Sequence, residues 1–339
     1  MQLPSVEKVF AGRFVINRVA GAGGMGTVYQ ACDLSTDRIV ALKVLQSQGS
    51  APQDTERFTR EAQLLTELHH PGIVAHVAHG QTSDAQQYLA MEWLDGEDLS
   101  QRLQKGPLSV HATIQIMRQV ASALAHAHAH GVLHRDLKPS NIFLIDGMTE
   151  QVKILDFGIA RRMQASQVMT RTGMLVGTPD YMAPEQARGE RVLSPAADIF
   201  SLGCLLYECL AGGPPFAGEH TASVLIRILM EQPAPLSQRR TGVPESLVAL
   251  IDKMLVKDPA QRICSAEELL VLSSRLEQPA DTPSITLTKA SCTTDSASFA
   301  SDEQELLCVI IATETAGEDL HGAVTAPLVE RPGSQRSKL

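Results

Sequence analysis

Residues 134–141 read HRDLKPSN, and this stretch decides how the rest of the chain is interpreted. Most of its side chains are polar, although it lies between an apolar segment that ends at Gly131 and the strand-like residues 142–144. Asp136 and Asn141 match the spacing HRDxxxxN, which is a pattern of phosphoryl-transfer loops. The stretch therefore predicts a loop that performs phosphoryl transfer.

Composition describes a chain with a substantial core and an acidic surface. The 339 residues suffice for one large domain or two smaller ones, and 44% of them are hydrophobic. The net charge of −9 argues against a binder of nucleic acid or of anionic membranes, because both require a basic surface. The six cysteines show no CxxC spacing, which favours free thiols in a reducing compartment. Cys204 and Cys209 lie in an apolar run that suits a buried helix.

The sequence shows no sign of a targeting or membrane segment. Its first residues lack a basic start followed by an apolar stretch, so we expect no signal peptide. No run approaches the roughly 18 apolar residues that a membrane-spanning helix needs. We therefore expect a soluble, cytoplasmic chain with no membrane contact over residues 1–339.

Hydrophobic periodicity divides the chain into a strand-rich part and a larger helical part. Strand-like runs occur within residues 14–45 and at 88–93, and a helical period covers 54–68. A break near residues 94–96 precedes the helical part. Its apolar periods are at residues 110–130, 196–211, 221–231, 244–255 and 265–276.

Composition also marks the two ends of the chain. We expect residues 1–13 to be an N-terminal extension. Residues 277–303 are rich in Ser, Thr, Asp and Pro, which is typical of a flexible linker. Residues 304–339 contain one strand-like run with no partner strand, and a lone strand cannot bury its faces. We interpret them as the truncated start of a second domain, with a disordered tail as the alternative.

A glycine-rich turn lies between two strand-like runs. Residues 21–28 read GAGGMGTV, the form GxGxxGxV, in which backbone N–H groups can approach phosphate oxygens closely. Alone, this pattern also fits a simple hairpin turn or a dinucleotide-binding turn. The dinucleotide interpretation expects a helix directly after the glycines, whereas Thr27, Val28 and Tyr29 are strand-like.

Lys43 is a charged residue inside an otherwise apolar strand. An unpaired buried ammonium group is costly, so its position needs an explanation. The functional interpretation is that Lys43 binds ATP phosphates and is held by Glu61 on the helix at residues 54–68. The alternatives are an edge-strand lysine that faces water and a Glu61 on a solvated helix face.

Asp156, Phe157 and Gly158 follow the strand-like residues 152–155. A DFG tripeptide alone is common and often forms a β-turn. Here Asp156 comes 20 residues after Asp136, which favours a functional role. Hard carboxylate and amide oxygens of this kind suit Mg²⁺.

Taken together, these motifs resemble the eukaryotic-type protein kinase family over about residues 14–276. The wordings GAGGMGTVY, HRDLKPSNIF and VGTPDYMAPEQ resemble its bacterial serine/threonine members. The resemblance implies an α+β, bilobal protein kinase fold. Residues 14–94 would form an N-lobe with a small antiparallel β-sheet and one main helix. Residues 95–276 would form a larger, mainly helical C-lobe.

The resemblance also implies a role for each matching residue. Asp136 would orient the substrate hydroxyl and accept its proton, and Lys138 would offset charge on the transferred phosphoryl group. Asn141 and Asp156 would bind Mg²⁺, with Mn²⁺ as an alternative. Thr178 would bridge Asp136 and Lys138 and help to select Ser and Thr as acceptors.

The nucleotide would be held by the glycine-rich turn, the strands and the segment between the lobes. Backbone groups of Glu92 and Leu94 would bond the adenine edge. Ala20 is smaller and Phe143 is larger than the residues usual in the family, which puts nucleotide affinity in question. The implied ATP-binding residues are Ala20, Gly21, Ala22, Gly23, Gly24, Met25, Gly26, Val28, Ala41, Lys43, Met91, Glu92, Leu94, Phe143 and Asp156.

Three further residues would have structural tasks. His134 would pack beneath the catalytic loop, and Asp198 would hold the backbone of that loop. Glu185 would pair with Arg262 in a buried contact. All of these roles are implied by the resemblance.

The leading hypothesis is therefore a serine/threonine protein kinase that uses ATP and acts on protein hydroxyls. A pseudokinase that acts as a scaffold predicts the loss of Lys43, Asp136, Asn141 or Asp156, and all four are present. A small-molecule phosphotransferase would usually lack the elements at residues 177–179 and 183–185 that seat a peptide.

We predict that Thr170 and Thr172 are autophosphorylated, by transient pairing of two copies of the chain, with an ordinary solvated loop as the alternative. A phosphothreonine carries about −1.5 to −2 charges and can order the segment next to Arg135, the neighbour of Asp136. Mass spectrometry of the fully active protein should find phosphate on at least one of them. Full activity with both threonines unmodified would contradict the prediction.

Overall fold

The computed structural model describes residues 9–23, 26–45, 52–157 and 179–276, without the side chains of residues 52–57, 60 and 61. The chain separates into two units, Met1–Thr282 and Pro283–Leu339, and the second unit lies outside the described residues. The expected linker and tail at 277–339 therefore remain predictions. Among the described residues, no helix is both long enough and apolar enough to cross a membrane.

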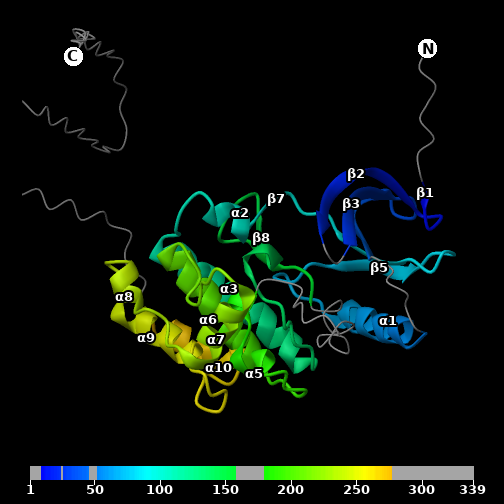
Figure 1. Cartoon of the computed structure of the whole chain (residues 1–339). Helices are drawn as coiled ribbons and strands as arrows, with labels where there is room; N and C mark the ends of the chain where they lie inside the picture. The colour runs from blue at the N-terminus through cyan, green and yellow to red at the C-terminus, as the bar shows by residue number, and fades with distance from the viewer. Residues whose placement is uncertain (1–8, 24–25, 46–51, 158–178, 277–339) are drawn as a thin grey trace, which may run out of the picture. The chain divides into compact units, whose positions relative to one another are not determined.

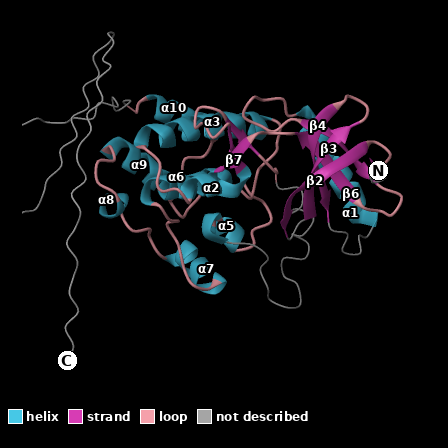
Figure 2. Ribbon diagram, turned by 90° about the horizontal axis from the view of Figure 1, so that it is seen from above, coloured by secondary structure: helices cyan, strands magenta, loops and turns pink. Residues whose placement is uncertain are grey.

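In the described part of the chain, the strands form two antiparallel sheets (Figures 1 and 2). The larger sheet has the order β1-β2-β3-β4-β6-β5, and the smaller one has the order β7-β8-β9. The larger sheet contains β1 (Val9–Phe10), β2 (Phe14–Gly23), β3 (Gly26–Asp33), β4 (Arg38–Leu45), β5 (His76–Gln81) and β6 (Gln87–Glu92). The smaller sheet contains β7 (Gly96–Asp98), β8 (Ile142–Ile145) and β9 (Val152–Ile154).

Helices are the main elements among the described residues after residue 98. They include two 3₁₀ turns, η1 (Pro139–Asn141) and η2 (Pro179–Tyr181). The α-helices are α1 (Pro52–Glu67), α2 (Leu99–Leu103), α3 (Val110–Ala129), α5 (Pro184–Ala187), α6 (Ala196–Ala211), α7 (Thr221–Met230), α8 (Leu236–Arg239), α9 (Glu245–Met254) and α10 (Ala266–Ser274). The expected order, a strand-rich part with one main helix followed by a mainly helical part, is confirmed.

The larger sheet forms around its own small apolar core. Phe14, Val40 and Leu42 are buried side chains from β2 and β4, and Ala31 and Ala90 join them from β3 and β6. The expected strands were found because β-branched and apolar residues are enriched in them. β5 was not expected, since its sequence HVAHGQ has no apolar alternation; it forms on the free edge of β6.

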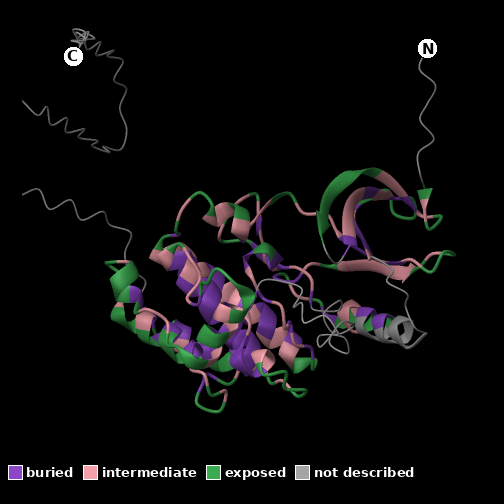
Figure 3. Cartoon of the chain, in the orientation of Figure 1, coloured by how far each residue is buried: buried purple, intermediate pink, exposed green. Residues whose placement is uncertain are grey.

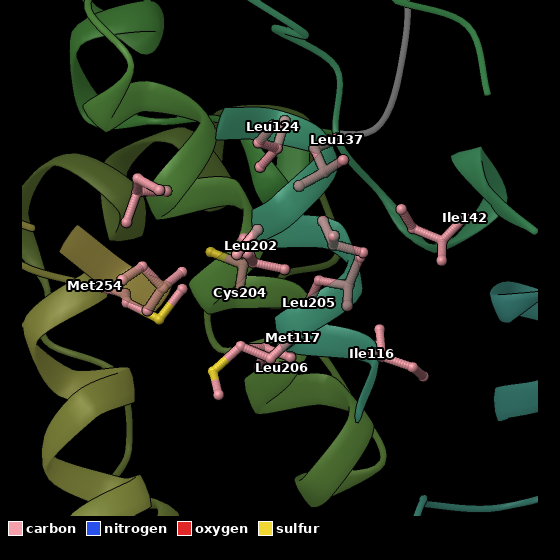
Figure 4. Close-up of a cluster of buried hydrophobic side chains, with 14 of the residues drawn as sticks. Ile116, Met117, Leu124, Leu137, Ile142, Leu202, Cys204, Leu205, Leu206 and Met254 are labelled. Atoms are coloured by element: carbon pink, nitrogen blue, oxygen red, sulfur yellow. The ribbon is translucent and has the colours of Figure 1, made fainter. Parts of the chain in front are cut away.

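α6 is the centre of the helical part. It is apolar on all sides, and nearly every residue in it is buried, as expected for a helix enclosed by others (Figure 3). Leu202, Leu205 and Leu206 on α6 lie in one cluster with residues of α3 and α9, among them Met117 and Met254 (Figure 4). The helix ends at Gly212, whose φ of 79° favours glycine.

The two cysteines of α6 belong to this core. Cys204 and Cys209 are both fully buried, and burial raises the pKa of each thiol far above its ordinary value. Both thiols are free and neutral at physiological pH. This agrees with the expectation of a buried helix at these positions.

A buried ion pair joins the start of α5 to the segment before α10. Arg262 donates to both carboxylate oxygens of Glu185, at 2.8 and 3.0 Å, and the two side chains are 0% and 3% exposed. Arg262 also donates to the carbonyls of Ala196 and Val256, at 2.6 and 2.8 Å. The predicted Glu185–Arg262 contact is confirmed, and it fixes α5 against the N-terminal end of α6.

Removal of one partner from this pair should destabilise the protein strongly. Glu185→Ala leaves a buried guanidinium charge without compensation, so the free energy of unfolding should fall by about 3–5 kcal/mol in urea titrations. Glu185→Gln, which keeps an acceptor, should lose less. Glu190→Ala, which breaks the exposed Arg188–Glu190 pair, should change stability by less than about 1 kcal/mol. Equal effects of Glu185→Ala and Glu190→Ala would contradict the prediction.

Candidate active site

The loop at residues 134–141 is held from below by the first turn of α6. One carboxylate oxygen of Asp198 accepts the backbone N–H of His134 at 2.8 Å, and the other accepts that of Arg135 at 2.8 Å. His128 on α3 donates to the first of these oxygens at 2.9 Å. Asp198 is 1% exposed, and the role predicted for it is seen directly.

The charge of Asp198 is stabilised by these donors. Burial alone would raise the pKa of its carboxyl group. The hydrogen bond from His128, electrostatic interactions with His128 and His134, and the Arg135 amide outweigh burial and hold this pKa below its ordinary value. Asp198 is therefore an ionised acceptor for the loop amides at neutral pH.

His134 packs beneath the loop, as expected. Its ring nitrogen Nε2 is 2.9 Å from the Leu155 carbonyl, and its ring centroid is 5.0 Å from that of Phe157. The Asp136 N–H donates to the other ring nitrogen, Nδ1, at 3.2 Å. Since Nδ1 accepts this bond, Nε2 carries the hydrogen and donates to Leu155. His134 thus links the loop to the residues on either side of Asp156.

Asp136, Lys138 and Asn141 lie together, as the HRDxxxxN spacing predicted. The Lys138 ammonium donates to the Asp136 carboxylate at 2.9 Å. The 3₁₀ turn η1 brings Asn141 back toward Asp136, where its Nδ2 donates to the backbone carbonyl at 2.7 Å and approaches the carboxylate at 3.5 Å. A carboxylate and an ammonium group thus lie side by side at the edge of the loop.

Lys43 reaches from the larger sheet to the DFG segment. Its Nζ donates to Asp156 Oδ2 at 2.6 Å, and the two side chains are 11% and 36% exposed. The sequence interpretation paired Lys43 with Glu61, whose side chain lies outside the described residues. The Lys43–Asp156 contact was not anticipated, because the two residues are 113 positions apart and no local pattern connects them.

The donor atoms at Asn141 and Asp156 fit a hard divalent cation. Asn141 uses its Nδ2 as a donor to Asp136, so its Oδ1 is the amide atom left to bind a cation. The backbone carbonyl of Asn141 accepts the Leu155 N–H at 2.8 Å, which ties Asn141 to the residue that precedes Asp156. One amide oxygen and one carboxylate suit Mg²⁺, which keeps several of its waters.

The glycine-rich turn connects two strands. β2 and β3 pair up to Gly23 and Gly26, so the dinucleotide interpretation, which requires a helix here, is excluded. Gly26 has a φ of 147°, and a Cβ atom there would lie 2.2 Å from the Val44 carbonyl oxygen. No other residue fits at Gly26 without a shift of the backbone.

The expected base-binding residues come from both sheets. Ala41 and Met91 are opposite each other on β4 and β6, Val28 pairs with Lys43, and Phe143 lies on β8. The N–H of Glu92 donates to the Ala75 carbonyl at 2.9 Å, so only its carbonyl can bond an adenine edge.

The Glu92 side chain has a task that sequence reasoning missed. Its carboxylate accepts the Ala75 N–H at 2.7 Å and a hydrogen bond from Lys153 of β9. The end of β6 is thereby tied to the smaller sheet.

Several predicted residues lie outside the described part of the chain, namely Gly24, Met25, Thr170, Thr172 and Thr178.

Comparison with known proteins agrees with the geometry. A family model described as "Protein kinase domain" matches residues 14–272. Serine/threonine-protein kinase PknA of Mycobacterium tuberculosis is 42% identical over 265 residues, which cover 76% of this chain and 60% of that protein. Serine/threonine-protein kinase pkn3 of Myxococcus xanthus is 39% identical over 271 residues, or 77% and 49%. The chain spans about half the length of these relatives.

Solved structures give the same result. The crystal structure of the Mycobacterium tuberculosis PknI kinase domain has a TM-score of 0.63 and 27% identity, over 80% of this chain and 99% of that one. The structure of Rad53 in complex with AMP-PNP has a TM-score of 0.64 and 30% identity, over 76% and 64%. The expected bilobal fold and the resemblance to bacterial members are confirmed, and the chain belongs to the protein kinase domain family.

Proposed function

We propose that this chain is a serine/threonine protein kinase that transfers the γ-phosphoryl group of ATP to hydroxyls of proteins. The observation that carries the proposal is the pairing of the Asp136 carboxylate with the Lys138 ammonium at 2.9 Å, on a loop fixed by a buried carboxylate. The named relatives, which are serine/threonine-protein kinases, support it.

In the proposed step, Asp136 accepts a hydrogen bond from the attacking hydroxyl and aligns its oxygen with the γ-phosphorus. A bond forms between that oxygen and phosphorus, the bond from phosphorus to the bridging oxygen breaks, and ADP leaves. The hydroxyl proton passes to Asp136 late in the reaction. Lys138 lies beside the carboxylate and stabilises negative charge on the transferred group.

Lys43, Asn141 and Asp156 would hold the nucleotide phosphates in line with this attack. The protein kinase family uses ATP with a divalent cation, and we propose Mg²⁺, with Mn²⁺ as a substitute, bound by Asn141 and Asp156. The cation would neutralise charge on the phosphates. Lys43 now contacts Asp156, and it can turn the same ammonium to a phosphate oxygen.

Serine and threonine are the proposed acceptors, and proteins are the proposed substrates. Lys138, two residues after Asp136, supports a Ser/Thr acceptor, as does the resemblance of the loop to the serine/threonine members of the family. We also propose that Thr178 helps to choose the acceptor and that Thr170 and Thr172 are phosphorylated between two copies of the chain. These three residues lie outside the described part of the chain.

Substitution of the two central charged residues should remove transfer without unfolding the protein. Asp136→Asn removes the proton acceptor and Lys43→Met removes a phosphate ligand, so each should lower transfer from labelled ATP by at least about 100-fold. The exposed Lys105–Glu97 pair offers a control, and Lys105→Met should keep wild-type turnover. Wild-type turnover in either of the first two variants would refute the assigned roles.

The support from Asp198 should also be measurable. Asp198→Asn replaces one acceptor oxygen with an NH₂ group that faces a backbone N–H, so kcat should fall by about 10- to 100-fold and stability by about 1–3 kcal/mol. His128→Leu removes one of the three donors and leaves both loop amides bonded, so turnover should fall far less. An equal loss in both variants would argue that Asp198 serves stability alone.

A further inference from the structure

Trp93 is the single tryptophan of the chain, and it lies between Glu92 and Leu94, the two residues expected to bond the adenine edge. Its indole N–H donates to the Asp95 carboxylate at 3.0 Å. The Arg18 guanidinium lies over the ring, with its carbon 5.3 Å from the ring centroid. The side chain is thus held at its edge and on its face.

The two partners of Trp93 connect it to different sheets, because Arg18 belongs to the larger sheet and Asp95 lies directly before β7 of the smaller one. Arg18 lies on β2, where its Nε donates to Gln30 of β3 at 3.1 Å. The backbone carbonyl of Asp95 accepts the N–H of Asp146, at the end of β8, at 3.0 Å. The indole therefore joins the larger sheet to the smaller one across the segment that connects them.

The local backbone of β2 places Arg18 over this ring. The β2–β3 ladder has irregularities between Ile16 and Arg18 and again between Val19 and Gly21. Such bulges bend a strand and redirect its side chains. Arg18 is only two residues before Ala20, which is expected to cover the nucleotide pocket as its roof. A constraint on Arg18 is therefore passed to the roof.

We propose that the Arg18–Trp93 pair positions the nucleotide. This proposal rests on ATP binding as part of the proposed function. The pair fixes the peptide groups on both sides of Trp93 and holds the start of the glycine-rich turn close to them. A site that is ordered before binding loses less entropy when the ligand enters. Arg18 has no proposed contact with the phosphates, so it acts through Trp93 and the roof.

Calorimetry of the 339-residue chain with AMP-PNP and with adenosine tests the pair. Arg18→Met keeps the aliphatic stem and removes the cation, so affinity should fall about twofold to fivefold, the range of an exposed cation–π contact. The loss should be the same for adenosine, because the pair acts at the base. Arg18→Lys, which keeps a cation, should recover part of the affinity. Arg38→Met, at an exposed arginine on β4, should bind as the wild type does.

Two further measurements separate positioning from mere stability. In steady-state assays, Arg18→Met should raise the KM for ATP and leave kcat within about twofold, at a temperature where the variant is fully folded. In a double-mutant cycle, Arg18→Met should cost no extra affinity when Trp93→Leu is already present. The emission of Trp93 should shift in Arg18→Met and respond to AMP-PNP in the wild type.

Failure of this proposal is distinct from failure of the proposed function. A wild-type chain that binds no AMP-PNP would overturn the proposed function, and the pair with it. If the wild type binds AMP-PNP normally and Arg18→Met equals it in affinity and KM, only the proposal for the Arg18–Trp93 pair is overturned. Additive losses in the double-mutant cycle would likewise show that Arg18 does not act through Trp93.

Discussion

The buried carboxylate of Asp198 is the constraint on which the candidate site depends. Its two oxygens accept the amides of His134 and Arg135, and Arg135 has a φ of 65°, which non-glycine residues adopt only where their surroundings hold them. Because α6 is enclosed by other helices, Asp198 has little freedom to move. The packed core of the helical part, and not a ligand, therefore sets the position of Asp136.

The charges at the site are arranged in pairs that a ligand can redistribute. Lys138 contacts Asp136 and Lys43 contacts Asp156, so each proposed acidic group has an ammonium beside it. Both carboxylates are partly accessible to water, which keeps such pairs modest in energy. A polyanionic nucleotide with its cation can therefore take over Lys43 and Asp156 at low cost, while the Asp198 contacts below the loop stay unchanged.

The sequence alone predicted much of the fold and the centre of the site. The helix expected at residues 196–211 coincides with α6, and Asp136, Lys138 and Asn141 are close because one short loop contains them. Contacts between distant segments were harder to predict. Lys43–Asp156 and Glu92–Lys153 join residues more than 60 positions apart, and β5 has a polar sequence whose strand conformation depends on the edge of β6. Tertiary pairing decides such elements, and local propensity does not.

Other hydrogen bonds between distant segments limit how α1 can move. After α1 ends, the N–H of Val74 donates to the Ile154 carbonyl at 3.0 Å, and the Ile154 N–H donates to the Gly72 carbonyl at 2.8 Å. The chain beyond the C-terminal end of α1 is therefore bonded to β9, two residues before Asp156. A rotation of α1 has to pivot near this end, because these bonds would otherwise break. The distance that a residue of α1 travels then grows with its distance from Glu67, so Glu61 would move farther than the residues beside the pivot.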